Sequence, residues 1–318
     1  MKRTYILLFA FPIIAFVTSS CEGKLDDLVE KGEYTVSTDA NYATFANFVD
    51  SFDVESSSTT KMLSVKSAGS DWRLSSDESW IHFTPSSGTG NMDVKCSFDD
   101  NPYAYKKRSG KIFLSTGKST ISTKVIQNVS DPNTECDPSS ISMGAAGGTT
   151  TVNVKSNCTN IRVADCPDYV EASYSDGKLV VTVSPNMTRS YRSDNIKISY
   201  DYRSSYYYED GLRTGTTYVS VYQDSPAFSV SPSYINYVSA EGQTFNVELS
   251  SDLPWKVEGS EYSWLQYSPA HGDSGMTTMT ITVSPNDTYD TRYGYINIYV
   301  GSYNIKSIEI RQYGKSRY

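Results

Sequence analysis

Residues 278–284 read Thr-Met-Thr-Ile-Thr-Val-Ser, an alternation of polar and apolar side chains with a period of two. Residues 149–155 and 179–184 follow the same pattern or nearly so, and all three runs are rich in β-branched residues. A period of two places every second side chain on the same face of a strand. These runs therefore predict half-buried β-strands. Beyond the N-terminal segment, only residues 40–50 leave room for a short turn of helix.

An ordered set of residues surrounds these runs and repeats along the chain. The first copy runs Trp72, Trp80-Ile81, Pro85-x-x-Gly88, Asn101, Arg108-x-Gly-x-Ile112 and Val125-x-Gln127. The last copy runs Trp255, Trp264-Leu265, Pro269-x-x-Gly272, Asn286, Arg292-x-Gly-x-Ile296 and Ile310-x-Gln312. A weaker middle copy keeps Ile161, Tyr169-Val170, Asn186, Arg192, Ile196 and Val221-x-Gln223. A period of about 90 residues suits one β-sandwich domain and is too long for a solenoid repeat.

This order of residues resembles the BACON domain, whose name stands for Bacteroidetes-associated carbohydrate-binding, often N-terminal. The resemblance covers most of residues 34–318 and is weakest in the middle copy, which lacks both Trp residues. It implies an all-β chain of three tandem immunoglobulin-like β-sandwich domains. It also implies a surface protein linked to glycan use, because such domains often accompany glycan-processing proteins.

The N-terminus reads as an export signal. Lys2 and Arg3 precede an apolar run at residues 5–17, and three small polar residues lead to Cys21. This order is typical of a secretory signal peptide. The Cys after small residues resembles a bacterial lipobox, which implies cleavage before Cys21 and lipidation of its thiol, although Thr18 stands where Leu is usual. The alternatives are an ordinary signal peptide with an incidental Cys, or an uncleaved anchor.

The stretch after Cys21 is acidic, and residues 22–27 resemble the surface-export tether of lipoproteins in the Bacteroidetes. We therefore expect a lipid-anchored protein of the outer membrane that faces the extracellular side. The expected organisation is a signal peptide at 1–20, the lipidated Cys and tether at 21–33, and sandwiches at 34–130, 131–225 and 226–318, the second being degenerate.

Composition limits the function. The chain has 318 residues with 13% aromatics, too many for a disordered chain, and a net charge of −8, which disfavours binding to nucleic acid. The two His residues lie far apart and there is no C-x-x-C pair, so neither a metal site nor a cofactor is predicted. Gly272-Asp-Ser274-Gly resembles a protease nucleophile segment, but it occupies the turn that residues 88–90 make in the first copy. We expect a non-catalytic protein.

Two functions remain open. One is the capture of polysaccharide or oligosaccharide near the outer membrane, alone or within a glycan-uptake complex. The other is a rigid structural spacer or an adhesin that binds another protein.

The middle copy has one long hairpin. The interval between the Ile and the closing Gln of the repeat is 27 residues there, against 15 in the first copy and 16 in the last. The extension is rich in tyrosine, and we predict a glycan site at Tyr200, Tyr202, Tyr206, Tyr207 and Tyr208. The alternative is that these rings pack on the neighbouring copy and stiffen the joint.

The remaining repeated residues favour structural roles. The four Trp residues of the repeat should fill the cores, and the repeated Arg should tie down loop carboxylates or carbonyls. Cys96 shares a face with Val94 and should be a small buried side chain. Cys136 and Cys158 could meet at one end of the middle sandwich and form a disulfide; unpaired thiols are the alternative.

Overall fold

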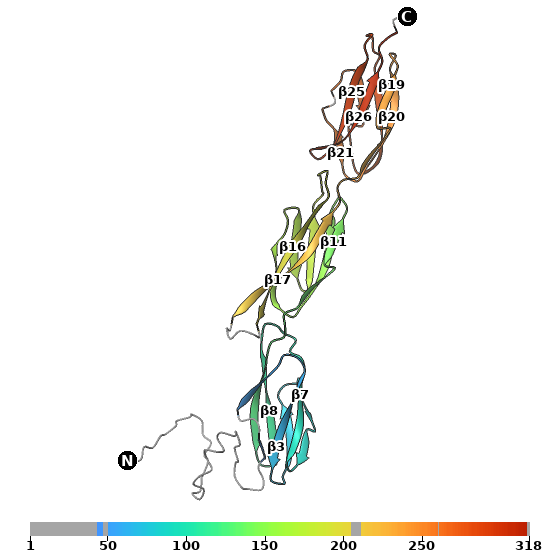
Figure 1. Cartoon of the computed structure of the whole chain (residues 1–318). Helices are drawn as coiled ribbons and strands as arrows, with labels where there is room; N and C mark the ends of the chain where they lie inside the picture. The colour runs from blue at the N-terminus through green and yellow to red at the C-terminus, as the bar shows by residue number, and fades with distance from the viewer. Residues whose placement is uncertain (1–42, 47–49, 205–210, 260, 317–318) are drawn as a thin grey trace, which may run out of the picture. The chain divides into compact units, whose positions relative to one another are not determined.

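The computed structural model describes residues 43–46, 50–204, 211–259 and 261–316, and within these ranges it contains strands and no helix. The strands form six sheets, which pack in pairs around three separate hydrophobic cores (Figure 1). No helix capable of crossing a bilayer occurs in these ranges. The prediction of immunoglobulin-like β-sandwiches is thus confirmed.

The chain divides into two compact units. One contains the first sandwich and comprises residues up to Asn101 and residues 107–128. The other comprises Pro102–Lys106 and residues 129–318, and contains the second and third sandwiches.

In the first sandwich, the hydrophobic core lies between a four-stranded and a five-stranded sheet. The four-stranded sheet has the order β1 (Ala43–Phe45), β3 (Thr59–Ser67), β7 (Met92–Phe98) and β5 (Ile81–Thr84). The five-stranded sheet has the order β2 (Ser51–Val54), β9 (Thr120–Gln127), β8 (Arg108–Thr116), β4 (Asp71–Ser76) and β6 (Ser87–Thr89). The turn of helix considered for residues 40–50 is wrong at 43–45, where Ala43 and Phe45 enter the core as alternate residues of a strand.

The second sandwich is built from two four-stranded sheets. One has the order β10 (Thr134–Asp137), β12 (Gly148–Ser156), β15 (Lys178–Val183) and β14 (Val170–Ser175). The other has the order β11 (Ser140–Met143), β17 (Leu212–Gln223), β16 (Arg192–Arg203) and β13 (Thr159–Asp165).

The third sandwich follows the plan of the first. Its four-stranded sheet has the order β18 (Phe228–Ser231), β20 (Gln243–Ser251), β24 (Gly275–Val283) and β22 (Leu265–Ser268). Its five-stranded sheet has the order β19 (Tyr234–Val238), β26 (Tyr303–Gln312), β25 (Arg292–Val300), β21 (Trp255–Val257) and β23 (His271–Gly272).

All three sandwiches share a divided first strand. Its first part, β1, β10 or β18, pairs antiparallel in one sheet. Its second part, β2, β11 or β19, crosses to the other sheet and runs parallel to the last strand of the sandwich. The middle copy thus keeps this divided first strand despite its degenerate sequence.

The tryptophans explain what the middle copy has lost. The Trp72 side chain of β4 is buried and lies against Gly88 of the neighbouring strand β6. The fit is so close that a Cβ added at Gly88 would lie 2.5 Å from the Trp72 ring. The same arrangement joins Trp255 to Gly272 of β23. Among the described residues of the second sandwich no strand pairs with the outer edge of β13, and the first Trp of the repeat and the Gly that faces it are both absent from this copy. Trp80 is buried and Trp264 partly so, which confirms the predicted core roles.

The repeated arginine has the predicted architectural role. Arg108 Nε donates to Gln127 at 2.6 Å, its Nη2 donates to two backbone carbonyls, and its guanidinium lies 4.4 Å from the Trp80 ring centre. The second sandwich repeats this with Arg192, Gln223 and Tyr169, and the third with Arg292, Gln312 and Trp264. Tyr169 therefore replaces the second Trp in the middle copy.

The possible Cys136–Cys158 disulfide is not formed, and both thiols are free. Cys136 pairs with Val154, and Thr134 at the start of β10 already pairs with Ser156. Cys158 lies beyond the end of β12, where its thiol approaches the Asn133 carbonyl, and Asn133 is three residues before Cys136. Three residues of extended chain span about 10 Å, whereas bonded cysteines need Cα atoms within about 7 Å. Cys96 is fully buried, as expected, and burial raises the pKa of its thiol to about 12.

Candidate functional site

The predicted tyrosine hairpin is longer than its counterparts. β16 and β17 pair without interruption from Arg192–Gln223 to Arg203–Leu212. Tyr200 and Tyr202 lie on the same face with ring centres 6.3 Å apart, but both are only partly exposed, and burial raises the pKa of Tyr200. Tyr206, Tyr207 and Tyr208 lie outside the described residues.

The described part of this hairpin is tied to another loop of the same compact unit. The Arg203 backbone N–H donates to the Ala104 carbonyl at 2.8 Å, and the Ala104 N–H donates to the Asn157 carbonyl at 2.9 Å. Tyr200 faces Gly215 so closely that a Cβ there would lie 2.4 Å from the ring. The Tyr200 ring thus packs on β17 of its own hairpin, and the glycan site at these tyrosines stays a prediction.

A larger set of exposed rings lies on the third sandwich. Along β25, Gly294 and Ile296 point into the core, so Tyr293 and Tyr295 point outward. They are 48% and 41% exposed. This alternation makes the outer surface of β25 aromatic.

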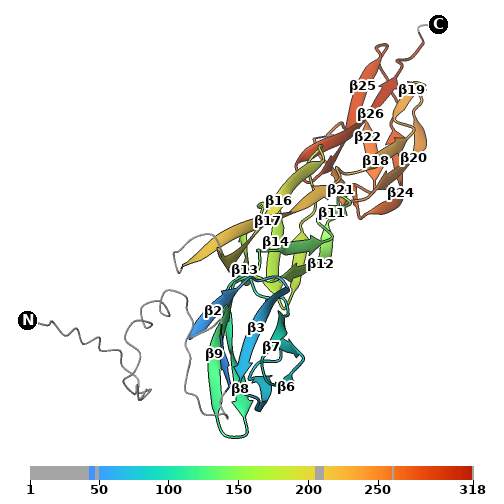
Figure 2. The same cartoon turned by 60° about the horizontal axis from the view of Figure 1, so that its bottom comes forward.

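The adjoining strands β26 and β19 continue this surface (Figures 1 and 2). Tyr295 is opposite Glu309 of β26, which is in turn opposite Tyr234 of β19. Tyr293 is opposite Arg311. We call this outer surface the tyrosine face; it comprises Tyr234, Tyr237, Tyr293, Tyr295, Glu309, Arg311 and Tyr313.

Ring contacts hold one end of the tyrosine face together. The Arg311 guanidinium lies 5.7 Å from the Tyr293 ring centre and 5.0 Å from that of Tyr313. Tyr313 stacks on Tyr237 with ring centres 6.0 Å apart and an interplanar angle of 27°. Tyr234 and Tyr237 are 61% and 75% exposed. Flat rings with polar ends, next to a carboxylate and a guanidinium, can offer both stacking and hydrogen bonds to a ligand.

The sequence analysis missed the tyrosine face, although the repeat carries a signal for it. The two variable positions of Arg-x-Gly-x-Ile point outward in β25. They are Ser109 and Lys111 in the first copy, and Tyr293 and Tyr295 in the third. Tyrosines spaced two apart on a strand lie on one face, and Tyr293 and Tyr295 have this spacing.

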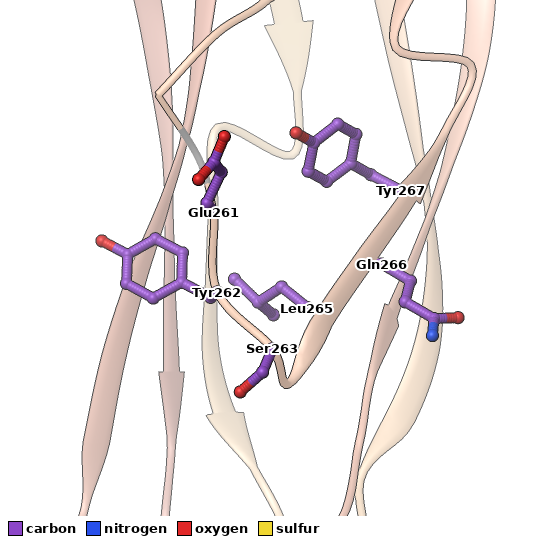
Figure 3. A pocket seen from close by; sticks show the side chains of 6 residues that line it. All are labelled: Glu261, Tyr262, Ser263, Leu265, Gln266 and Tyr267. Atoms are coloured by element: carbon purple, nitrogen blue, oxygen red, sulfur yellow. The ribbon is translucent and has the colours of Figure 1, made fainter.

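A shallow hollow lies beside β22 and is lined by Glu261, Tyr262, Ser263, Leu265, Gln266 and Tyr267 (Figure 3). Tyr267 extends from the strand toward the loop that carries Glu261, while the Tyr262 ring points away from Tyr267 (Figure 3). Tyr262 instead packs against Trp264, with ring centres 5.7 Å apart. This hollow thus presents fewer open rings than the tyrosine face.

Metal-binding groups do not gather in the part of the chain that the structure describes: no cluster of three or more His, Cys, Asp or Glu side chains is present there. The candidate site is therefore the tyrosine face.

Comparison with known proteins finds one family that parts of the chain resemble. The BACON family model, described as "Putative binding domain, N-terminal", matches residues 70–128 and 254–312. These two stretches, which resemble the BACON family, lie in the first and third sandwiches. The second stretch includes β25 and β26, which carry most of the tyrosine face. The expected resemblance is thereby confirmed for these two copies.

Similar solved structures are distant. A GH5 xyloglucanase from Bacteroides ovatus, in complex with a XXXG heptasaccharide, is 16% identical over 33% of this chain, with a TM-score of 0.27. The chain spans 22% of the length of that enzyme. A titin I-band fragment is 10% identical over 86% of this chain and 98% of that chain, with a TM-score of 0.30. These TM-scores are low, so the fold assignment depends on the strand pairing. No curated protein matches the chain.

Proposed function

We propose that this protein is a lipid-anchored, cell-surface glycan-binding protein without catalytic activity, and that it captures polysaccharide on the tyrosine face of the third sandwich. The observation that carries the proposal is the set of exposed rings spaced by two residues along β25 and continued across β26 and β19. The match to a family of binding domains over part of the same surface supports it.

The chemistry of the tyrosine face suits sugars. A pyranose ring has an apolar face of C–H groups that can stack on an aromatic ring, and an edge of hydroxyls that needs donors and acceptors. Tyr293, Tyr295 and Tyr234 supply rings that lose little rotamer entropy on binding. Glu309 accepts hydrogen bonds and Arg311 donates them. Small-molecule sites are typically concave, whereas an open sheet face leaves room for a chain to continue past the site on both sides.

The test compares two pairs of tyrosines. Tyr293→Ala with Tyr295→Ala should weaken binding to a retained polysaccharide at least about tenfold, because stacking on each ring contributes roughly 1 kcal/mol. The matched control is Tyr218→Ala with Tyr222→Ala, two exposed tyrosines of β17 in the second sandwich. Affinity electrophoresis of the mature chain against a panel of plant, algal and host polysaccharides measures the effect.

The control variant should bind as the wild type does, and all three proteins should melt at the same temperature. Equal binding by the Tyr293/Tyr295 variant and the wild type would remove the tyrosine face from the proposal. Failure of the wild type to bind any polysaccharide in the panel would overturn glycan binding itself.

The proposed anchor lies outside the described residues. It is supported by the order of basic, apolar and small residues before Cys21 and by the acidic stretch after it. Cys21→Ser should leave the precursor unprocessed or release the protein from the membrane fraction. A mature, membrane-bound Cys21→Ser protein would contradict the proposal. Surface proteolysis of intact cells tests whether the chain faces the extracellular side.

A structural spacer or an adhesin is the second candidate function. The backbone hydrogen bond from Arg203 to Ala104 favours it, because that contact restrains the long hairpin. This role does not require exposed tyrosines on the third sandwich. The same two double variants separate the two functions. In a spacer or adhesin, the Tyr293/Tyr295 variant would function as well as the Tyr218/Tyr222 variant.

A further inference from the structure

Arg311 differs from the other arginines that pack on rings. Arg108, Arg192 and Arg292 each lie beside an aromatic ring and donate to a glutamine and to backbone carbonyls. Arg311 lies between Tyr293 and Tyr313, yet its Nε–H is buried and has no hydrogen-bond acceptor. Arg311 also forms no ion pair with any residue in the described ranges, Glu309 included.

The fold does not require an arginine here. The residue before the closing glutamine is Ile126 in the first copy and Tyr222 in the second. Both occupy the outer face of the same strand in their sandwiches. A partly buried cation without an acceptor is destabilising, so its presence in only one copy needs another explanation.

Arg311 is only partly buried, so the outer N–H groups of its guanidinium can reach a ligand, and a bound anion would supply acceptors for them. A guanidinium presents its donors as a planar fork that matches the oxygens of a carboxylate or a sulfate, and such charge-assisted hydrogen bonds are about twice as strong as neutral ones. The rings of Tyr293 and Tyr313 both lie within cation–π distance of the guanidinium and help to position it. Glu309 would repel a second anion near Tyr295 and Tyr234, so the acidic group should lie at the Arg311 end.

We infer that the tyrosine face selects acidic glycans, with a sugar-borne carboxylate or sulfate paired to Arg311. The inference rests on the proposed function, because it specifies the glycan bound at the same surface. The net charge of −8 repels polyanions at long range, but salt screens this repulsion beyond about 8 Å at physiological ionic strength. The local contact with Arg311 therefore decides selectivity.

The experiment uses two matched pairs of polymers on the mature chain. Polygalacturonic acid and highly methyl-esterified pectin share a backbone and differ in free carboxylates; dextran sulfate and dextran differ in sulfates. The wild type should bind the acidic member of at least one pair about ten- to a hundredfold more tightly, as expected for one hydrogen-bonded charge pair. The pair that shows the preference identifies the acidic group.

Variants assign the preference to Arg311. Arg311→Gln should lower affinity for the acidic polymer to that for its neutral partner, and should leave the neutral affinity within about twofold. Arg311→Lys should retain part of the preference, because it keeps the charge but not the planar fork. Arg73→Gln is the matched control, since it removes one exposed positive charge from β4 of the first sandwich and should change neither affinity.

Equal affinity for both members of each pair, or an equal loss of both in Arg311→Gln, would overturn acid selectivity. In that case glycan binding would stand, provided that the Tyr293→Ala/Tyr295→Ala variant still lost it. Binding to neither pair, nor to any polysaccharide of the panel, would overturn the proposed function together with this inference.

Discussion

In the first sandwich Arg108 donates from Nε to Gln127 at 2.6 Å; in the third, the equivalent arginine and glutamine are 2.8 Å apart. Both arginines lie 4.4 Å from the centre of a Trp ring, and both sandwiches fit a glycine against a second Trp. On the outer face of the same sheet the two sandwiches differ. The first presents Ser109 and Lys111 where the third presents Tyr293 and Tyr295.

This difference separates the residues that build the domain from those that give one copy a function. In Arg-x-Gly-x-Ile, the fixed residues form the inner network and the core, and the variable residues face solvent. Side chains on the solvent face can change with little effect on folding. A repeated sandwich can therefore keep one interior and carry a binding surface on only one copy.

The largest expected effect tests the shared interior. Gln127→Leu in the first sandwich and Gln312→Leu in the third should each destabilise their sandwich by about 1.5–3 kcal/mol, because each leaves the arginine Nε–H without its acceptor and removes one of the donors to two backbone carbonyls. Hydrogen exchange read peptide by peptide measures each sandwich separately. The exposed Gln266→Leu is the control and should have little effect. If one sandwich tolerated the loss of its buried glutamine, the two interiors would not be equivalent.

The second effect distinguishes the two cores. Cys96 of β7 in the first sandwich has a pKa raised by burial to about 12, from 9.0, whereas the equivalent strand of the third sandwich, β24, buries Met279, Ile281 and Val283 and no thiol. Between pH 9 and about pH 12 the Cys96 thiol of the unfolded chain loses its proton, whereas that of the folded chain keeps it. The stability of the first sandwich should therefore fall as pH rises above 9, by up to about 1.4 kcal/mol per pH unit.

Cys96→Val should remove this component of the alkaline sensitivity and leave the third sandwich unchanged. Exchange rates of the two sandwiches, compared at pH 8 and pH 10 after correction for intrinsic exchange, measure it. An alkaline sensitivity that is the same in wild type and variant would mean that another group titrates.

The inward-facing residues that the first and third sandwiches share could be predicted from the sequence. The spacing of Trp80 and Arg108 matches that of their counterparts in the third copy, and residues held in register by a core recur at fixed intervals. The long hairpin was predicted from the number of residues between the Ile and the closing Gln of the repeat, which is also read directly from the sequence. Contacts between strands were harder to predict. Cys136 and Cys158 were brought together by assuming where β10 starts, and the actual register places Cys136 opposite Val154.

The binding surface depends on pairing even more strongly. Tyr234, Glu309 and Tyr295 come from three strands that are far apart in the sequence, and they lie side by side only because β19 runs parallel to β26. No local pattern contains that information. The consecutive tyrosines of the long hairpin give a stronger local signal in the sequence, but they lie outside the described residues.

A smaller effect is expected from exchanging the outer faces. Tyr293→Ser with Tyr295→Lys gives the third sandwich the residues of the first, and should change its free energy of unfolding by less than about 1 kcal/mol while glycan binding is lost. The reciprocal Ser109→Tyr with Lys111→Tyr should fold normally and create no site, because the first copy has Lys124 and Ile126 where the third has Glu309 and Arg311. A large destabilisation in either swap would show that these positions also support the fold.

The smallest expected effect concerns the second sandwich, which lacks both Trp residues of the other two and carries three cysteines. A disulfide would be a natural replacement for lost packing, since it restricts the unfolded chain. The strand register excludes the Cys136–Cys158 pair, and Tyr169 already replaces the second Trp beside Arg192. A reducing agent should therefore leave the melting temperature unchanged. Mass spectrometry after alkylation of the denatured chain should find Cys136 and Cys158 both modified without prior reduction. A drop in melting temperature on reduction, with one of these thiols protected from alkylation beforehand, would mean that the second sandwich is held together differently from its neighbours.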